Sequence, residues 1–385
     1  MDRAFVQFHL LYKKTEIEGG VRCLQNGFSS VWSLANPVWV YQEKGILPEL
    51  PVDVDEYYIS VWGFADLAVS RAWAKKNPDK KFILGGPVVL YTPKSMVKKA
   101  FAEYKNVELL PNLSEDIFGI KFSSKNWGIK FPDIQERVSI YSYHLGDSCY
   151  WSKCTFCTVP EGNTWIEPRD EYDVEMLWDA PKGIVWLATP AIPPSKLDVL
   201  LRLNYSGKIY RTFIRADKST YDSLEKIIDR IPSKKMMFNV GVEFPSNKML
   251  SKVNKGVTVS DLTRILNLIY ERGQQASCSY LTNLHGIGKD EVEEAKSFFK
   301  SLKDQTGSGI DTRHHFRKCV NFGTHGDIPI GCRGIHIGFY DKLTEEEEYW
   351  DTEWMKALKG FGARLRVQGV VDFNTGLSTE KILNS

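Results

Sequence analysis

Several features that place a chain in a special class are scarce or missing in this sequence of 385 residues. No apolar run approaches the roughly 20 residues that a membrane-spanning helix needs. The first residues lack the basic and then apolar layout of a secretory leader, so we expect a cytoplasmic protein with no membrane partner. The formal net charge is only +2, which gives no reason to expect a polycationic nucleic-acid coat. With 25% charged and 43% hydrophobic residues, the composition excludes a disordered chain.

Cysteine is scarce too. Its seven copies are an odd number spread over a long chain, which argues against a disulfide scaffold. Three of them are nevertheless close together, as Cys149, Cys154 and Cys157. A triplet of unpaired thiols is costly to keep, because thiolates oxidise and bind metals. One interpretation is a zinc site with a distant fourth ligand. The other is a [4Fe–4S] cluster with three cysteine ligands, whose fourth iron stays open for a substrate or cofactor.

Residues 134–345 show the alternation of strands and helices that is typical of a parallel α/β fold. The pattern predicts six strands, at 138–143, 183–189, 208–215, 236–243, 276–282 and about 317–322. Helices are predicted before the fifth strand and after Gly288. In such folds the working groups lie at the carboxyl ends of the strands. The residues that fall at these ends are the cysteine triplet, Thr189, Arg215, Glu243 and Asn283.

The segments on either side of this region differ from it. Residues 1–133 contain a predicted strand at 56–62, a helix at 65–75 and a strand at 81–87, which is a Rossmann-like order. The second of these strands ends in Gly85 and Gly86, where backbone is able to approach a ligand closely. Residues 346–385 form a short C-terminal extension. The run Glu345–Glu348 predicts a solvated helix face. We expect the aromatic residues that follow to pack this tail over the preceding region: Tyr349, Trp350 and Trp354.

The cysteine loop resembles the cluster loop of the radical S-adenosylmethionine (SAM) superfamily, which reads Cys-x3-Cys-x2-Cys with an aromatic residue before the last cysteine. Phe156 takes the aromatic position, and four residues rather than three separate Cys149 from Cys154. Further segments are similar to parts of the superfamily members that carry a cobalamin-binding domain. These segments are Phe213-Ile-Arg215-Ala-Asp217, Gly241-Val-Glu243-Phe-Pro-Ser246 and Asn254-Lys-Gly256.

This resemblance implies an architecture. Residues 1–133 are expected to form a Rossmann-like, cobalamin-binding-type domain. Residues 134–345 are expected to form a partial (β/α)6 TIM-type radical SAM barrel, and residues 346–385 the C-terminal extension.

The resemblance also implies a set of site residues. Cys149, Cys154 and Cys157 ligate the [4Fe–4S] cluster, and Phe156 lies near the adenine of SAM. Arg215 meets the SAM carboxylate, for which a bidentate guanidinium is well suited. Glu243 accepts hydrogen bonds from the ribose hydroxyls or the methionyl ammonium. The superfamily's Gly-Gly-Glu on the second strand is missing here, so Thr189 takes over the contact with the ammonium. Judged without the resemblance, Arg215 and Glu243 also fit solvated charges at strand ends.

The implied activity is the reductive cleavage of SAM, which yields a radical that modifies an unactivated centre of the substrate. A one-electron reductant such as flavodoxin or ferredoxin is the implied partner. If cobalamin binds, methyl transfer is the expected outcome. The cobalt-ligating motif Asp-x-His-x-x-Gly is absent and His9 is the only histidine before His144, which leaves cobalamin binding open. The alternative function is a non-catalytic zinc or iron–sulfur protein that uses the triplet structurally.

The remaining cysteines and several histidines follow in the second half of the chain. Cys278 lies within an apolar strand and is expected to be a buried, inert thiol. For Cys319 and Cys332, an auxiliary cluster and a structural role both stay open. The histidines near them, either substrate-facing or structural, are His314, His315 and His325.

Overall fold

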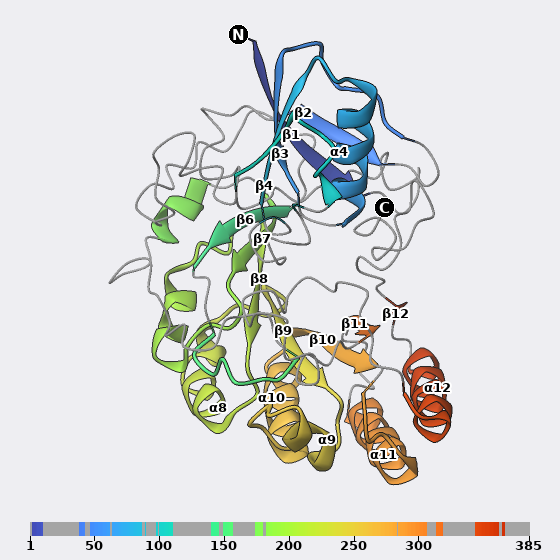
Figure 1. Cartoon of the computed structure of the whole chain (residues 1–385). Coiled ribbons are helices and arrows are strands. Elements are labelled where there is room, and N and C mark those ends of the chain that lie inside the picture. The colour runs from blue at the N-terminus through green and yellow to red at the C-terminus, as the bar shows by residue number, and fades with distance from the viewer. Residues whose placement is uncertain are drawn as a thin grey trace. The chain divides into compact units, whose positions relative to one another are not determined.

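The computed structural model of the chain forms two compact units that divide between Ser142 and Tyr143, within the strand Ile140–His144, which pairs in the sheet of the second unit. Each unit is an α/β domain built on a parallel sheet (Figure 1). The structure describes residues 2–10, 38–42, 47–61, 64–86, 89, 98, 100–110, 140–145, 149–156, 174–179, 182–282, 284–305, 313–318, 343–361 and 364–365.

The first unit holds a five-stranded sheet in the order β2-β1-β3-β4-β5, with every neighbouring pair parallel. Its strands are β1 (Arg3–Leu10), β2 (Val38–Gln42), β3 (Glu56–Ser60), β4 (Lys81–Gly85) and β5 (Val107–Leu109). Helix α4 (Phe64–Lys76) connects β3 to β4. This order reverses direction between β1 and β3, and such a reversal in a doubly wound sheet opens a crevice at the carboxyl ends of those strands. The predicted strands at 56–62 and 81–87 and the helix at 65–75 are confirmed.

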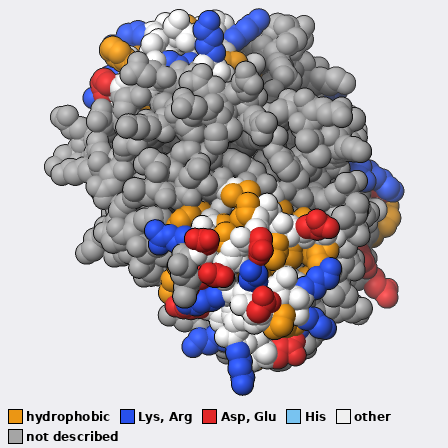
Figure 2. Space-filling model, turned by 90° about the horizontal axis from the view of Figure 1, so that it is seen from above, with side chains coloured by type: hydrophobic (Ala, Val, Ile, Leu, Met, Phe, Trp, Pro, Cys, Tyr) orange, Lys and Arg blue, Asp and Glu red, His pale blue; other side chains and the backbone are white. Residues whose placement is uncertain are grey.

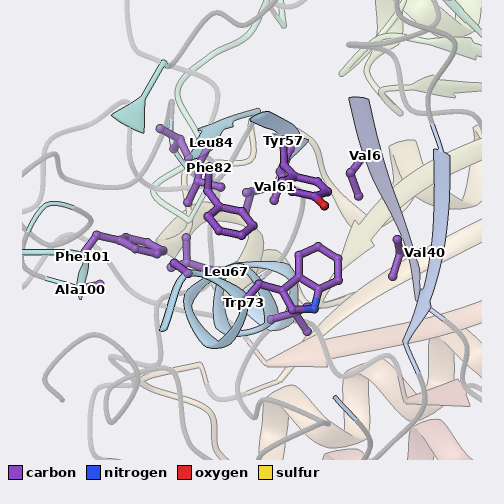
Figure 3. Packing of buried hydrophobic residues seen from close by; sticks show 14 of the residues in the cluster. Val6, Val40, Tyr57, Val61, Leu67, Trp73, Phe82, Leu84, Ala100 and Phe101 are labelled. Atoms are coloured by element: carbon purple, nitrogen blue, oxygen red, sulfur yellow. The ribbon is translucent and has the colours of Figure 1, made fainter. Parts of the chain in front are cut away.

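The core of this unit lies between α4 and the sheet (Figure 3). Trp73 is fully buried, and its indole N–H donates to the Pro48 carbonyl at 2.6 Å. The rings of Tyr57 and Phe82, from adjacent strands, stack with centroids 5.2 Å apart. A buried Trp or Tyr needs a partner for its polar atom, and the loop carbonyl provides one for Trp73.

Gly86, at the end of β4, has a φ of +91°. A Cβ added there would lie 2.9 Å from the Val61 carbonyl oxygen. The glycine pair predicted that backbone approaches a ligand closely here. In the structure, the backbone of Gly86 instead approaches the end of the neighbouring strand, which explains the glycine without a ligand.

The second unit holds a seven-stranded sheet whose spatial order, β12-β11-β10-β9-β8-β7-β6, is also the order along the chain. The strands are β6 (Ile140–His144), β7 (Gly183–Ala188), β8 (Lys208–Ile214), β9 (Met236–Glu243), β10 (Gln275–Thr282), β11 (Arg313–Lys318) and β12 (Arg364–Leu365). The helices are α8 (Lys218–Glu225), α9 (Asn247–Lys252), α10 (Val259–Glu271), α11 (Lys289–Gln305) and α12 (Glu345–Gly360), with short 3-10 helices η2 (Val174–Asp179), η3 (Pro194–Arg202) and η4 (Ile228–Arg230).

Burial alternates along β7 and β8, whereas β9 and β10 are buried along almost their whole length. In β8, Tyr210, Thr212 and Ile214 are buried, while the residues between them are half-buried. Figure 1 shows α8, α10 and α11 along one side of the sheet. Because β7 to β12 pair in parallel, their carboxyl ends meet at one edge. That edge is where the sequence predicts the working groups.

The first five predicted strands agree with β6 to β10, whereas the sixth is wrong by four residues. It was expected at about 317–322, but β11 spans Arg313–Lys318. That strand reads Arg-His-His-Phe-Arg-Lys, which has almost no apolar alternation, so the sequence signal was weak. His314 and His315 lie within it, and His325, Cys319, Cys332 and Asn283 lie outside the described residues. Cys278 is buried in β10 as predicted, and burial raises the pKa of its thiol to about 12.

Helix α12 packs on this unit. Trp354 is fully buried, donates its indole N–H to the Leu281 carbonyl at 2.8 Å and stacks on Phe299 with ring centroids 5.5 Å apart. The expectation of a packed aromatic tail is confirmed for Trp354 and wrong for Tyr349, which is 58% exposed. The solvated charge run is only partly correct, because Glu347 is half-buried and accepts the Gly286 N–H at 2.6 Å.

On the face shown in Figure 2, acidic and basic side chains of the described residues are interspersed, in keeping with the small net charge. In the part of the chain that the structure describes, we find no helix long and apolar enough to cross a membrane.

Candidate functional site

The cysteine loop follows β6, the edge strand of the second unit's sheet. The structure describes its residues 149–156, in which Cys149 and Cys154 are half-buried. Cys157 lies outside the described residues, so the ligand triplet stays a prediction. Within the described ranges, no group of three His, Cys, Asp or Glu side chains is placed to hold a metal ion.

The turn after α9 holds this loop from one side. The Trp151 indole N–H donates to the Asn254 carbonyl at 2.8 Å, and the Thr155 N–H donates to the Val253 carbonyl at 3.1 Å. Gly256 in the same turn has a φ of +68°, and a Cβ added there would overlap the ring of Trp151. Only glycine fits beneath this ring, so the Asn254-Lys-Gly256 segment is explained by the docking of the cysteine loop.

Arg215 begins the segment after β8 and lies against the same loop. Its Nη2 donates to the Lys255 carbonyl at 2.5 Å, and its Nε donates to Asp217 Oδ2 at 3.1 Å. The guanidinium carbon lies 4.8 Å from the centre of the Trp151 ring, which is cation–π distance. With 5% of Arg215 exposed, the alternative of a solvated charge is wrong.

Asp217 joins the loop to α8. Its carboxylate accepts the Tyr150 hydroxyl at 2.6 Å and the Thr220 N–H at 2.9 Å, so it also caps the helix. Burial raises the pKa of Asp217, but hydrogen bonds from Tyr150, Thr220 and Ser219 outweigh burial and lower it. Burial together with the adjacent carboxylate raises the pKa of the Tyr150 phenol. The pair therefore stays as phenol and carboxylate, and one acidic group fixes both Tyr150 and Arg215.

Glu243, the last residue of β9, forms a buried ion pair. Its Oε1 lies 2.7 Å from Lys255 Nζ, and both side chains are more than nine-tenths buried. Its Oε2 is buried with no hydrogen-bond partner among the described residues. A Cβ added at Gly241 would lie 2.7 Å from Lys255 Nζ, so this glycine leaves room for the pair. The alternative of a solvated carboxylate is thus wrong for Glu243 as well.

Lys255 links this ion pair to the aromatic position of the loop, because its Nζ lies 5.7 Å from the Phe156 ring centre. Burial lowers the pKa of Arg215, but the nearby thiolates of Cys154 and Cys149 raise it above its usual range. Burial likewise lowers the pKa of Lys255, and Glu243 and Cys154 raise it. Two buried cations therefore lie near Cys149 and Cys154.

Thr189 follows β7, the strand next to β8. It is buried, and its Oγ1 has no hydrogen-bond partner in the described part of the chain. No hydrogen bond or ion pair of the described residues joins it to the other predicted positions. The structure therefore brings together Cys149, Cys154, Phe156, Arg215 and Glu243, with Thr189 one strand away.

Sequence reasoning missed the residues that fasten the site: Tyr150, Trp151, Asp217 and Lys255. Two signals were available. Tyr150 and Trp151 stand inside the cysteine loop, where large aromatic residues need something to pack on. Lys255 lies between Asn254 and Gly256, in a segment that was noted only for its resemblance.

Comparisons with known proteins give a likeness of fold. No family model matches the sequence, and no curated protein is similar to it. The chain aligns over 99% of its length with 57% of apo OxsB, a cobalamin-dependent SAM radical enzyme, at 13% identity and a TM-score of 0.50. It aligns over 77% of its length with 52% of OxsB bound to aqua-cobalamin, at 15% identity and a TM-score of 0.47. The chain also aligns over 83% of its length with 72% of TsrM from Kitasatospora setae, a radical SAM methyltransferase with cobalamin and a [4Fe–4S] cluster bound. The sequence identity is 10% and the TM-score is 0.48.

These structural neighbours are cobalamin-dependent radical SAM enzymes. The resemblance read from the cysteine loop is thereby confirmed as a likeness of fold. The chain spans only 52–57% of the OxsB chains.

Proposed function

We propose that this chain is a radical SAM enzyme. In this proposal Cys149, Cys154 and Cys157 ligate a [4Fe–4S] cluster, and residues 134–345 form the partial (β/α)6 barrel around it. The observation that carries the proposal is the convergence of the cysteine loop with buried Arg215 and Lys255 at the carboxyl edge of a sequentially ordered parallel sheet. Charges of both signs are buried there at considerable cost, and a site for charged ligands accounts for that cost.

The donor set fits the cluster and SAM. Half-buried thiols next to two buried cations are suited to act as thiolate ligands of iron. Glu243 Oε2, which has no partner among the described residues, accepts hydrogen bonds and so suits hydroxyl or ammonium groups. Thr189 Oγ1, also without a partner in the described part of the chain, offers a second oxygen at the same edge.

The cluster and SAM, when bound, supply the one-electron cleavage of the sulfonium. The residues of the chain bind and orient. Arg215, fixed by Asp217 and the Lys255 carbonyl, would offer its remaining N–H groups to a carboxylate. Lys255 holds Glu243 at Oε1, so that Oε2 keeps a single direction. The aromatic rings of Tyr150, Trp151 and Phe156 help to exclude water from these charges.

The first unit is proposed to be the Rossmann-like, cobalamin-binding-type domain, with its boundary near residue 133. Its β2-β1-β3-β4-β5 order supports this, because a doubly wound sheet binds its ligand where the order reverses. His9 is the penultimate residue of β1, beside that reversal. Methyl transfer to an unactivated centre of the substrate is the proposed reaction with cobalamin bound. A flavodoxin or ferredoxin is the proposed electron donor, and residues 346–385 are the proposed extension.

The proposal is tested by anaerobic reconstitution of the full chain with iron and sulfide, followed by incubation with SAM and a one-electron reductant. The expected result is a brown protein with about four irons per chain that releases 5′-deoxyadenosine or S-adenosylhomocysteine. The Cys154→Ala variant is expected to lose the cluster. Cys278→Ala is the matched control, because that thiol is buried in β10 and is expected to have no part in the cluster.

A colourless protein with one tightly bound zinc and no SAM turnover would overturn the proposal in favour of a structural metal site. Full iron content in Cys154→Ala would overturn the cluster assignment. Absence of bound corrin after incubation with hydroxocobalamin would remove the methyl-transfer part alone.

A further inference from the structure

A group of polar and aromatic residues lies across β7, β8 and β9. It consists of Trp186, Arg211, Phe213 and Asn239, which we call the donor face. In the sheet register Trp186 is opposite Arg211, and Phe213 is opposite Asn239. These residues occupy alternate positions to the buried Tyr210, Thr212 and Ile214, so they share the other side of the sheet.

The orientation of the Asn239 amide is fixed by its neighbour. Arg211 Nε donates to Asn239 Oδ1 at 2.9 Å. Since a guanidinium only donates, the amide oxygen must face Arg211, and the amide nitrogen points elsewhere. Asn239 is 1% exposed, and its Nδ2 is buried with no hydrogen-bond partner among the described residues.

Trp186 presents a second donor of the same kind. Its Nε1 is buried, and it too has no partner in the described part of the chain. Its ring lies 6.3 Å from that of Phe213, centroid to centroid, which limits the positions of the indole. An indole N–H cannot accept a hydrogen bond, so only an acceptor satisfies it.

Both unmatched atoms are thus donors, and the guanidinium of Arg211 lies on the strand between them. A buried donor that lacks a hydrogen-bond partner is unfavourable, so the presence of two such donors together favours a ligand that supplies acceptors. We infer that the donor face binds an oxyanion group, a carboxylate or a phosphate, of the molecule on which the enzyme acts. That this molecule is the substrate rests on the proposed function; the oxyanion binding itself does not.

The inference is tested on the full chain with ¹⁵N-labelled indoles, by NMR titration with sodium acetate and, separately, with inorganic phosphate. Sodium chloride at equal ionic strength is the reference. The Trp186 signal is identified by its loss in Trp186→Phe. We expect a saturable shift of this signal with at least one of the two anions. Acetate alone points to a carboxylate ligand, and phosphate alone to a phosphate ligand.

Asn239→Asp keeps the acceptor that Arg211 needs but replaces the unpaired donor with an acceptor. We expect it to weaken anion binding about tenfold or more. Asn204→Asp, which adds the same charge in the turn before β8, is the matched control and is expected to bind as the unchanged protein does. No saturable shift with either anion, or equal binding by Asn239→Asp, would overturn the inference. The test needs no iron, so its outcome is independent of whether SAM is cleaved.

Discussion

The docking of the cysteine loop on Gly256 leads to the sharpest prediction. In Gly256→Ala, the added Cβ would meet the ring of Trp151, which must then move. Trp151 connects the loop to the Asn254 carbonyl and stacks on Arg215. We expect this variant to lose cluster binding, because the loop that carries Cys149 and Cys154 is displaced.

The cost has three parts. A non-glycine residue at a φ of +68° costs about 1–2 kcal/mol. The lost hydrogen bond from Trp151 costs about 1 kcal/mol. The lost contact between Trp151 and the Arg215 guanidinium costs about 1 kcal/mol. The sum is about 3–4 kcal/mol, of which roughly half arises from the ring rather than from the backbone.

Gly273→Ala separates these contributions. Gly273 has a φ of +67°, and its added Cβ would meet the Ser233 side chain, with Oγ at 2.5 Å. Rotation of this hydroxyl away from the Cβ breaks only its exposed hydrogen bond to the Gly273 carbonyl. We expect it to cost about 1–2 kcal/mol in urea unfolding and to keep its iron. Iron per chain after reconstitution and the unfolding midpoint are measured for both variants. If Gly256→Ala retains full iron, or is no less stable than Gly273→Ala, the docking argument is refuted.

Two further predictions concern charges. Lys255→Met leaves Glu243 buried without its cation, so we expect the free energy of unfolding, measured in urea, to fall by about 3–5 kcal/mol. The double variant with Glu243→Gln should recover part of this loss. A loss below about 1 kcal/mol would count against a stabilising ion pair. Burial raises the pKa of Glu347, but hydrogen bonds from Thr344 and Gly286 lower it to about 2, below the usual 4.5. The contribution of the Glu347 carboxylate to the free energy of unfolding, about 2–3 kcal/mol, is therefore complete above pH 4.5. It disappears as the pH falls toward 2. The stability difference between Glu347→Gln and the exposed control Glu345→Gln should shrink over that window, and a constant difference would contradict it.

The sequence predicted the fold where the strands had a clear apolar signal, either alternating or continuous. The strands β8, β9 and β10 agree with the expected ranges within one residue. The range of β11 was predicted four residues too late, because Arg313–Lys318 lacks apolar alternation. The strands β1, β2 and β5 were not predicted at all. Glu347 shows a different limit: a run of acids looks solvated, and only tertiary packing reveals that one member binds Gly286.

For the candidate site, the sequence found the residues that carry charge but not those that hold them. Arg215 and Glu243 were identified from strand ends and resemblance. Their partners Asp217 and Lys255 lie two and twelve residues further along the chain. A contact such as that between Arg215 Nη2 and the Lys255 carbonyl involves backbone, so no side-chain pattern encodes it.

Backbone strain gives an independent reason to treat this region as a ligand site. Four non-glycine residues of the described chain have positive φ, and three of them, Ser152, Glu243 and Asn254, belong to the loop, the ion pair and the turn beneath them. Each costs about 1 kcal/mol or more, and such strain persists only where the surroundings enforce it. At Glu243 the strain accompanies an irregularity in the pairing of β9 with β10, where Ser279 is opposite Gly241 and Tyr280 is opposite Glu243. The proposed SAM site gives this strain a purpose, because it requires the Glu243 carboxylate to be held in one direction.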